Sequence, residues 1–225
     1  MAHSESDASR LLLEDHPAAW RWSLVLWGMA GFLFVAMALP TLRELVQTVD
    51  DEVWRLAGSL SNDVAVALAK AFDLIGSSWV TVPVVIVVAA ALAFQRRWGA
   101  LATWLVAMAV SQLMIGPVKN LYQRPRPPLP LVETTSWAFP SGHAVAGAAI
   151  AVALVIVWTR PGPLRRNLMV LAALFSFLMA LSRVYLRAHW LSDVAAGVAL
   201  GAAAAIGAAA AVQWWRVRRA DAERV

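Results

Sequence analysis

The feature that most limits the fold of this chain is a series of six apolar runs, because several of them approach the ~20 residues that cross a bilayer as a helix. The runs lie at about 20–39, 78–94, 98–115, 143–159, 168–181 and 189–215. They lack the polar face that a helix of a soluble bundle keeps toward water. The chain of 225 residues is 60% hydrophobic and 15% charged. We therefore expect an all-α integral membrane protein, a bundle of six transmembrane helices, and not a large soluble helical bundle.

One membrane domain is expected at 20–215, between a flexible polar tail at 1–19 and a basic tail at 216–225. Nothing indicates a second domain or a repeat. The segment 41–78 is mixed, and in part of it apolar residues recur every three or four positions between acidic ones. Two interpretations stay open for it: an amphipathic helix on the membrane surface, or a connecting helix that packs on the bundle and covers the site.

Basic residues set the expected orientation. Arg96-Arg97 and the stretch 160–166 form short basic turns, and the C-terminal residues are again rich in Arg. With six spans, these turns and both termini share one side, which the positive-inside rule assigns to the cytoplasm. A proline-rich loop at 118–142 and the segment 182–193 then lie together on the extracytoplasmic side. The Arg residues of the cytoplasmic turns and tail account for most of the net charge of +5. The charge therefore does not indicate a nucleic-acid partner, and none is expected.

Of the four histidines, His189 lies in the second of these segments and is followed four residues later by an acid, and His143 comes directly after the first segment. If the sixth helix begins at His189, then His189 and Asp193 share one face, one turn apart. The carboxylate would hold the proton of one imidazole nitrogen and leave the other free to attack or to take a proton. The alternative is an Asp at a helix start beside an incidental histidine.

Two further polar stretches, at 119–127 and 139–143, offer groups that suit an anion. The turn at Ser141-Gly142, before a helix that begins at His143, exposes backbone N–H groups, although Ser141 is equally well read as a helix cap. Lys119, Arg124 and Arg126 are cations that match phosphate oxygens or, alternatively, only lipid headgroups.

Together these groups predict phosphoryl transfer. Cations stabilise the pentavalent transition state, and two histidines serve as nucleophile and general acid. The chain has no cysteine and no cluster of acidic residues of the kind that Mg²⁺ needs. We therefore expect a metal-independent reaction through a phosphohistidine, with no cofactor.

The same segments form three motifs, which read K-x6-RP from Lys119 to Pro127, PSGH from Pro140 to His143 and SR-x5-H-x3-D from Ser182 to Asp193. In this order they resemble the three signature motifs of the type 2 phosphatidic acid phosphatase superfamily. All three match completely, and the resemblance covers about 20–215. The motifs thereby point to a family of phosphatases.

The resemblance implies a role for each motif residue. His189 would be the nucleophile, Asp193 would orient it, and His143 would protonate the leaving oxygen before water attacks the phosphohistidine. The phosphate would be held by Lys119, Arg126, Ser141, Gly142 and Arg183. Arg124 and Arg187 lie outside the fixed positions of the motifs and bind either a second phosphate or only headgroups.

The resemblance also implies a class of substrate. The superfamily contains soluble haloperoxidases that hold vanadate, but the apolar runs make this chain similar to its small membrane phosphatases of the bacterial inner membrane. Our first choice is undecaprenyl or another polyprenyl diphosphate, converted to the monophosphate during cell-wall synthesis. Phosphatidic acid or phosphatidylglycerol phosphate, cleaved with broad specificity, comes next, followed by lipid A or glycolipid phosphates and polyprenyl-phosphate sugar phosphates. A non-catalytic phospholipid-binding protein is the alternative from another class, and the oligomeric state is left open.

Overall fold

The computed structural model describes residues 16–223, which form helices and no strands, as the sequence predicted. The helices are α2 (His16–Ala38), α3 (Pro40–Ser59), α4 (Asp63–Gly76), α5 (Ser78–Phe94), α6 (Trp98–Tyr122), α7 (Gly142–Trp158), α8 (Pro163–Tyr185) and α9 (Leu191–Ala222). Most of the tail expected at 1–19 lies outside the described residues, and the basic residues expected as a tail from 216 onward continue α9 to Ala222.

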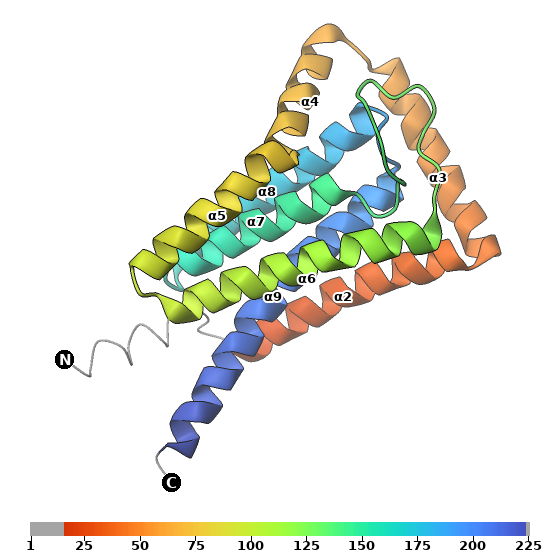
Figure 1. Ribbon diagram of the computed structural model, residues 1–225. Coiled ribbons are helices and arrows are strands. Elements are labelled where there is room, and N and C mark those ends of the chain that lie inside the picture. Colours follow the sequence, from red (N-terminus) through yellow and green to blue (C-terminus); the bar gives the residue numbers. More distant parts are fainter. Residues whose placement is uncertain (1–15, 224–225) are drawn as a thin grey trace.

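Helix α9 lies at the centre of the bundle and packs against α2, α6, α7 and α8 (Figure 1). Its glycines permit the closest of these approaches. A Cβ at Gly201 would lie 2.2 Å from the carbonyl oxygen of Val145, and one at Gly197 would lie 2.8 Å from that of Ser141. Small residues four positions apart let two helix backbones come together in this way. This Ala- and Gly-rich helix therefore packs closely against α7.

Within residues 16–223, four helices are long and apolar enough to cross a membrane: Ala18–Ala38, α6, α8 and α9. A fifth candidate is the pair α4 and α5, which is bent by 45°. Helix α7 is apolar but has only 17 residues, or about 25 Å of helix. The structure thus supports a membrane-spanning helical bundle with four or five such spans, and it does not confirm the expected count of six.

The segment 41–78 forms α3 and α4, and both pack against α8. They surround the end of the bundle that carries the loop after α6 (Figure 1). Asp50 on α3 is only 2% exposed, because it faces the bundle and not water. Of the two interpretations offered for this segment, the structure favours a connecting segment packed over the site.

Helix α6 does not end with its apolar run at about residue 115, and its last turn occupies the start of the loop expected at 118–142. It continues through Pro117 to Tyr122, and the chain then turns at Gln123, which has a left-handed φ of 44°. Lys119 therefore lies on the last turn of a helix and not in a loop, which gives its side chain a rigid base.

Candidate active site

The three motifs meet at one end of the bundle, where α7 and α9 begin and α6 and α8 end (Figure 1). The amide of Ser141 donates to the carbonyl oxygen of Asp193 at 3.1 Å, and the indole of Trp190 donates to Pro125 at 2.9 Å. Phe139 is fully buried, with its ring centroid 5.1 Å from that of Tyr122. These contacts hold the loop after α6 against the core, so residues far apart in sequence lie close together.

His189 and Asp193 form the expected pair. The Nδ1 atom of His189 lies 3.3 Å from Oδ2 of Asp193, and the same oxygen accepts a hydrogen bond from the backbone of Trp190 at 2.9 Å. Helix α9 begins only at Leu191, so the expectation that His189 starts this helix is wrong. The pair forms nonetheless because Asp193 in the first helical turn reaches back to the residues that precede the helix.

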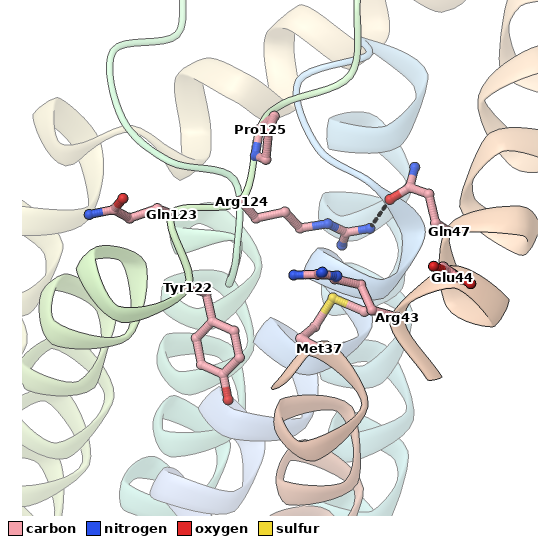
Figure 2. A pocket seen from close by; sticks show the side chains of 8 residues that line it. All are labelled: Met37, Arg43, Glu44, Gln47, Tyr122, Gln123, Arg124 and Pro125. Atoms are coloured by element: carbon pink, nitrogen blue, oxygen red, sulfur yellow. Dashed lines mark hydrogen bonds between the residues drawn. The ribbon is translucent and has the colours of Figure 1, made fainter. Parts of the chain in front are cut away.

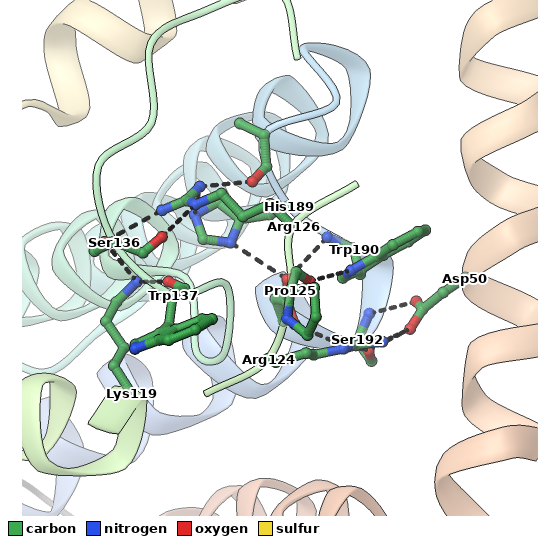
Figure 3. A network of polar contacts seen from close by, with 12 residues as sticks. Asp50, Lys119, Arg124, Pro125, Arg126, Ser136, Trp137, His189, Trp190 and Ser192 are labelled. Atoms are coloured by element: carbon green, nitrogen blue, oxygen red, sulfur yellow. Dashed lines mark hydrogen bonds and ion pairs between the residues drawn. The ribbon is translucent and has the colours of Figure 1, made fainter. Parts of the chain in front are cut away.

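The other nitrogen of His189 faces the cations of the site. Its Nε2 lies 3.2 Å from Nη1 of Arg126 (Figure 3). Burial lowers the pKa of His189 to about 4, although Asp193 acts in the opposite direction. The imidazole is therefore neutral at pH 7, and with the proton on Nδ1 toward Asp193 its Nε2 carries the lone pair that a nucleophile needs.

Lys119 and Arg126 are fixed by a residue that the sequence had not indicated, Ser136. Arg126 donates from Nε to the carbonyl oxygen of Ser136 at 2.6 Å, and Lys119 donates from Nζ to the Ser136 hydroxyl at 3.2 Å. Arg126 also donates to the carbonyl oxygen of Ala188 at 2.6 Å. Burial, together with the nearby Arg183, lowers the pKa of Arg126. These cations are held close together, which is unfavourable unless an anion binds among them.

Two further residues of the expected phosphate site are buried and carry polar atoms without a partner. Among the described residues, the Ser141 hydroxyl and Nε of Arg183 are buried side-chain atoms that make no hydrogen bond. Ser141 occupies the N-cap position of α7, as one of the two interpretations expected, but its side chain makes no capping hydrogen bond. Gly142 opens α7, and N–H groups in the first turn of a helix lack helical partners. Buried donors of this kind normally find an acceptor.

His143 lies at the start of α7 beside an acid that sequence reasoning missed. Its Nε2 is 3.1 Å from Oδ1 of Asp73, and Arg183 pairs with the same carboxylate oxygen. Asp73 comes from α4, within the segment that had been read only as a surface or connecting helix. The sequence signal that could have identified Asp73 is its position as an acidic residue between the apolar Phe72 and Leu74.

Arg124 does not bind a second phosphate or headgroups, as had been considered. Its side chain is 6% exposed, and its guanidinium donates to Asp193 and to Asp50, each at 2.6 Å. Gln47 on α3 accepts a further hydrogen bond at 2.8 Å, beside a cavity of about 330 Å³ (Figure 2). Arg124 is therefore committed to the protein as a support for Asp193.

Arg187 was the second cation without an assigned role. Its guanidinium lies over the ring of Trp54, 5.3 Å from the centroid, and it points to α3. This contact is a cation–π interaction. In the described part of the chain, no group of three or more His, Cys, Asp or Glu side chains is arranged to hold a metal ion, and the metal independence expected from the sequence stays a prediction.

Known proteins with similar sequences are phosphatases. Phosphatidylglycerophosphatase B of Bacillus subtilis is 27% identical over 176 residues, which are 76% of this chain and 85% of the relative. Decaprenylphosphoryl-5-phosphoribose phosphatase of Mycobacterium tuberculosis is 40% identical over 107 residues, 44% of this chain and 55% of the relative. The second match thus spans about half of that relative.

Two solved structures share the fold. A transmembrane PAP2-type phosphatidylglycerolphosphate phosphatase from Bacillus subtilis superposes with a TM-score of 0.69 and 23% identity, over 89% of this chain and 96% of the other. LpxE of Aquifex aeolicus superposes with a TM-score of 0.58 and 23% identity, over 70% of this chain and 92% of the other. The PAP2 superfamily matches residues 100–217, just over half of the chain. The chain therefore belongs to the PAP2 superfamily and is, as expected, an enzyme of the lipid phosphatase class.

Proposed function

We propose that this protein hydrolyses a lipid phosphate or diphosphate through a phosphohistidine at His189. The observation that carries the proposal is the surroundings of His189 Nε2. A neutral, buried imidazole faces Arg126, and two buried donor atoms of the same site, the Ser141 hydroxyl and Nε of Arg183, make no hydrogen bond. A phosphate would supply acceptors to these donors and negative charge to the cations.

In the first step, Nε2 of His189 attacks phosphorus and forms the P–N bond. The bond from phosphorus to the leaving oxygen breaks, and its electron pair goes to that oxygen, which takes a proton from His143. Lys119, Arg126 and Arg183 stabilise the charge on the equatorial oxygens of the transition state, where most of the catalysis in phosphoryl transfer arises. Asp193 stabilises the positive charge that develops on the His189 ring.

In the second step, water attacks the phosphohistidine. His143, now neutral, takes a proton from the water as its oxygen bonds to phosphorus. The P–N bond breaks and its electron pair returns to Nε2 of His189. Inorganic phosphate leaves, and both histidines regain their starting states.

We place this reaction on the extracytoplasmic side of a bacterial inner membrane, with α5, α6, α7, α8, α9 and the N-terminal helix α2 as six spans. The α5–α6 and α7–α8 connections and the end of α9 lie at one end of the bundle, and the loop 123–141 lies at the other (Figure 1). The basic turns and the basic end of α9 are thus remote from the site, which suits a cytoplasmic location for both termini.

Two relatives of this chain point to different lipid substrates. The relative matched over most of its length is a phosphatidylglycerophosphatase, which favours phosphatidylglycerol phosphate. The relative with the higher identity, over a shorter stretch, acts on a decaprenyl-linked sugar phosphate. A polyprenyl diphosphate, our first choice from the sequence, stays a candidate beside them.

Phosphate release by the purified protein in detergent tests the proposal. The panel holds polyprenyl diphosphate, phosphatidylglycerol phosphate, phosphatidic acid, a polyprenyl-linked sugar phosphate and a soluble ester. We expect at least one lipid to be cleaved and His189→Ala to lose about 10³-fold or more in rate, while His3→Ala, as matched control, keeps the wild-type rate. ³²P from a labelled lipid should be trapped on the wild type in acid-quenched samples and be absent from His189→Ala.

The same experiment tests the alternative of a non-catalytic lipid-binding protein. Binding requires only the cations, so a wild type that binds lipid phosphates without releasing phosphate would support that alternative. Equal phosphate release from the wild type and His189→Ala would also overturn the phosphohistidine mechanism.

A further inference from the structure

Asp73 and His143 form a second His–Asp pair, separate from that of His189 and Asp193. The Nε2 atom of His143 lies 3.1 Å from Oδ1 of Asp73 and 3.1 Å from the Asp73 carbonyl oxygen. Both contacts come from α4, near the end of that helix. An imidazole N–H held by two oxygens of one residue has a fixed orientation.

Gly76 allows α4 to come close enough for this contact. A Cβ at Gly76 would lie 2.5 Å from Cδ2 of His143 and 2.9 Å from Sδ of Met179. Atoms do not approach so closely without displacement, so any larger residue at this position would push α4 away from the ring. Because Cδ2 and Nε2 are adjacent atoms, the edge of the imidazole that contains Nε2 faces α4. The nitrogen left for the leaving oxygen is Nδ1.

The charges around His143 explain why an acid is useful here. Arg183 on α8 pairs with the same Asp73 oxygen that contacts the ring. A cation therefore lies close to His143 and opposes a positive imidazole, whereas the Asp73 carboxylate favours one. A general acid must carry its proton when the leaving oxygen departs. Without Asp73, the cations that hold the phosphate would also drive the proton from His143.

We propose that Asp73 is a positioning residue for the general acid, which it orients through Nε2 and whose positive form its carboxylate stabilises. This inference rests on the proposed function. When phosphorus is attacked, His143 donates the Nδ1 proton to the leaving oxygen, and the Nε2 proton stays in the hydrogen bond to Asp73. In the second step Nδ1 takes a proton back from water. The Asp73 carboxylate also pairs with Arg183, so one acid fixes both the general acid and a phosphate ligand.

The test uses two monoesters with the same alkyl tail, one that releases an alcohol and one that releases a nitrophenol. A nitrophenolate leaves without a proton, so only the alkyl ester depends on general acid catalysis. General acid catalysis typically raises a rate by ~10²–10⁴-fold. We therefore expect Asp73→Asn to slow hydrolysis of the alkyl ester about 10- to 100-fold and hydrolysis of the nitrophenyl ester less than about 3-fold. Asp63→Asn, which removes an exposed acid from the same helix, should leave both rates unchanged.

Two further variants keep the test decisive. Gly76→Ala retains the Asp73 charge but displaces α4 from His143, and it should show the same selective loss on the alkyl ester. In a His143→Ala background, Asp73→Asn should cause no further loss on the alkyl ester, because residues that act as one unit are non-additive.

The outcomes separate this inference from the proposed function. If the wild type cleaves both esters and Asp73→Asn slows them equally, or leaves both unchanged, Asp73 does not position the general acid. If the wild type cleaves neither ester nor any lipid of the panel, the proposed function itself fails.

Discussion

The Asp193 carboxylate is shared between two side chains: one oxygen lies 2.6 Å from Nη1 of Arg124, and the other lies 3.3 Å from Nδ1 of His189. Arg124 is held in turn by Asp50 on α3, whose carboxylate also accepts a hydrogen bond from the amide of Ser192 at 2.9 Å. A buried carboxylate keeps its charge only with such partners. The group that orients the nucleophile therefore depends on a helix outside the three motifs.

Arg124→Gln should weaken both the fold and the reaction. It leaves Asp50 and Asp193 buried without their cation, and breaking a buried ion pair typically costs about 3–5 kcal/mol of stability. We expect a lower thermal unfolding midpoint in detergent and a fall in kcat of about 10-fold or more, because Asp193 no longer holds one orientation. Circular dichroism and phosphate release measure the two effects.

An exposed ion pair on the same helix provides the control. Glu52 and Arg55 pair on the surface of α3, where the Glu52 side chain is 65% exposed. Glu52→Gln should therefore change stability by less than about 1 kcal/mol and leave kcat unaltered. A Glu52→Gln effect as large as that of Arg124→Gln would show that α3 is simply intolerant of substitution.

His189 should stay neutral far below neutral pH. Burial lowers its pKa from 6.5 to about 4, so its contribution to stability is present above pH 6.5 and is lost as the pH falls through 4. In ¹⁵N NMR spectra the ring should keep neutral-imidazole shifts from pH 8 to about pH 5. Asp193 raises this pKa, so Asp193→Asn should lower it further. A midpoint above pH 6 in the wild type would contradict this account of the nucleophile.

Chelation of metal ions should leave phosphate release intact, because the proposed reaction uses histidines and cationic side chains only. Vanadate should inhibit competitively, since it takes the trigonal-bipyramidal shape of phosphorus under attack. The measurement is the rate of phosphate release with EDTA and, separately, with vanadate. Strong inhibition by EDTA that Mg²⁺ reverses would overturn the metal-free mechanism.

Gly201→Ala should destabilise the contact between α7 and α9. Its added methyl group would meet the Val145 carbonyl oxygen at 2.2 Å, and overpacking of this kind costs about 1–3 kcal/mol. Activity should fall as well, since α7 carries His143. Gly28→Ala is the matched control, because a Cβ there has nothing within 4 Å; in a helix this change should raise stability by about 0.5–1 kcal/mol. Thermal unfolding of the two variants in detergent should therefore shift in opposite directions.

Much of this protein could be read from residue types and spacing alone. Apolar runs determine helices because a backbone in a bilayer must satisfy its hydrogen bonds internally, and the structure has a helix at each run. The pair of His189 and Asp193 was predictable because the two residues are four positions apart, a spacing at which the local backbone can bring their side chains into contact. Helix ends were less predictable, since α6 continues through Pro117 and α9 begins after His189.

What only the tertiary structure decided is the set of acids that support the motifs. Asp73 and Arg183 are 110 residues apart in the chain, and Asp50 and Ser192 are 142 apart. No local pattern encodes such contacts, because they depend on how α3 and α4 cross α8 and α9. By itself the sequence determined which groups perform the chemistry, through local spacing and charge. Helix packing decided which buried partners hold them, since a buried charge is stable only where the fold brings an opposite charge within reach.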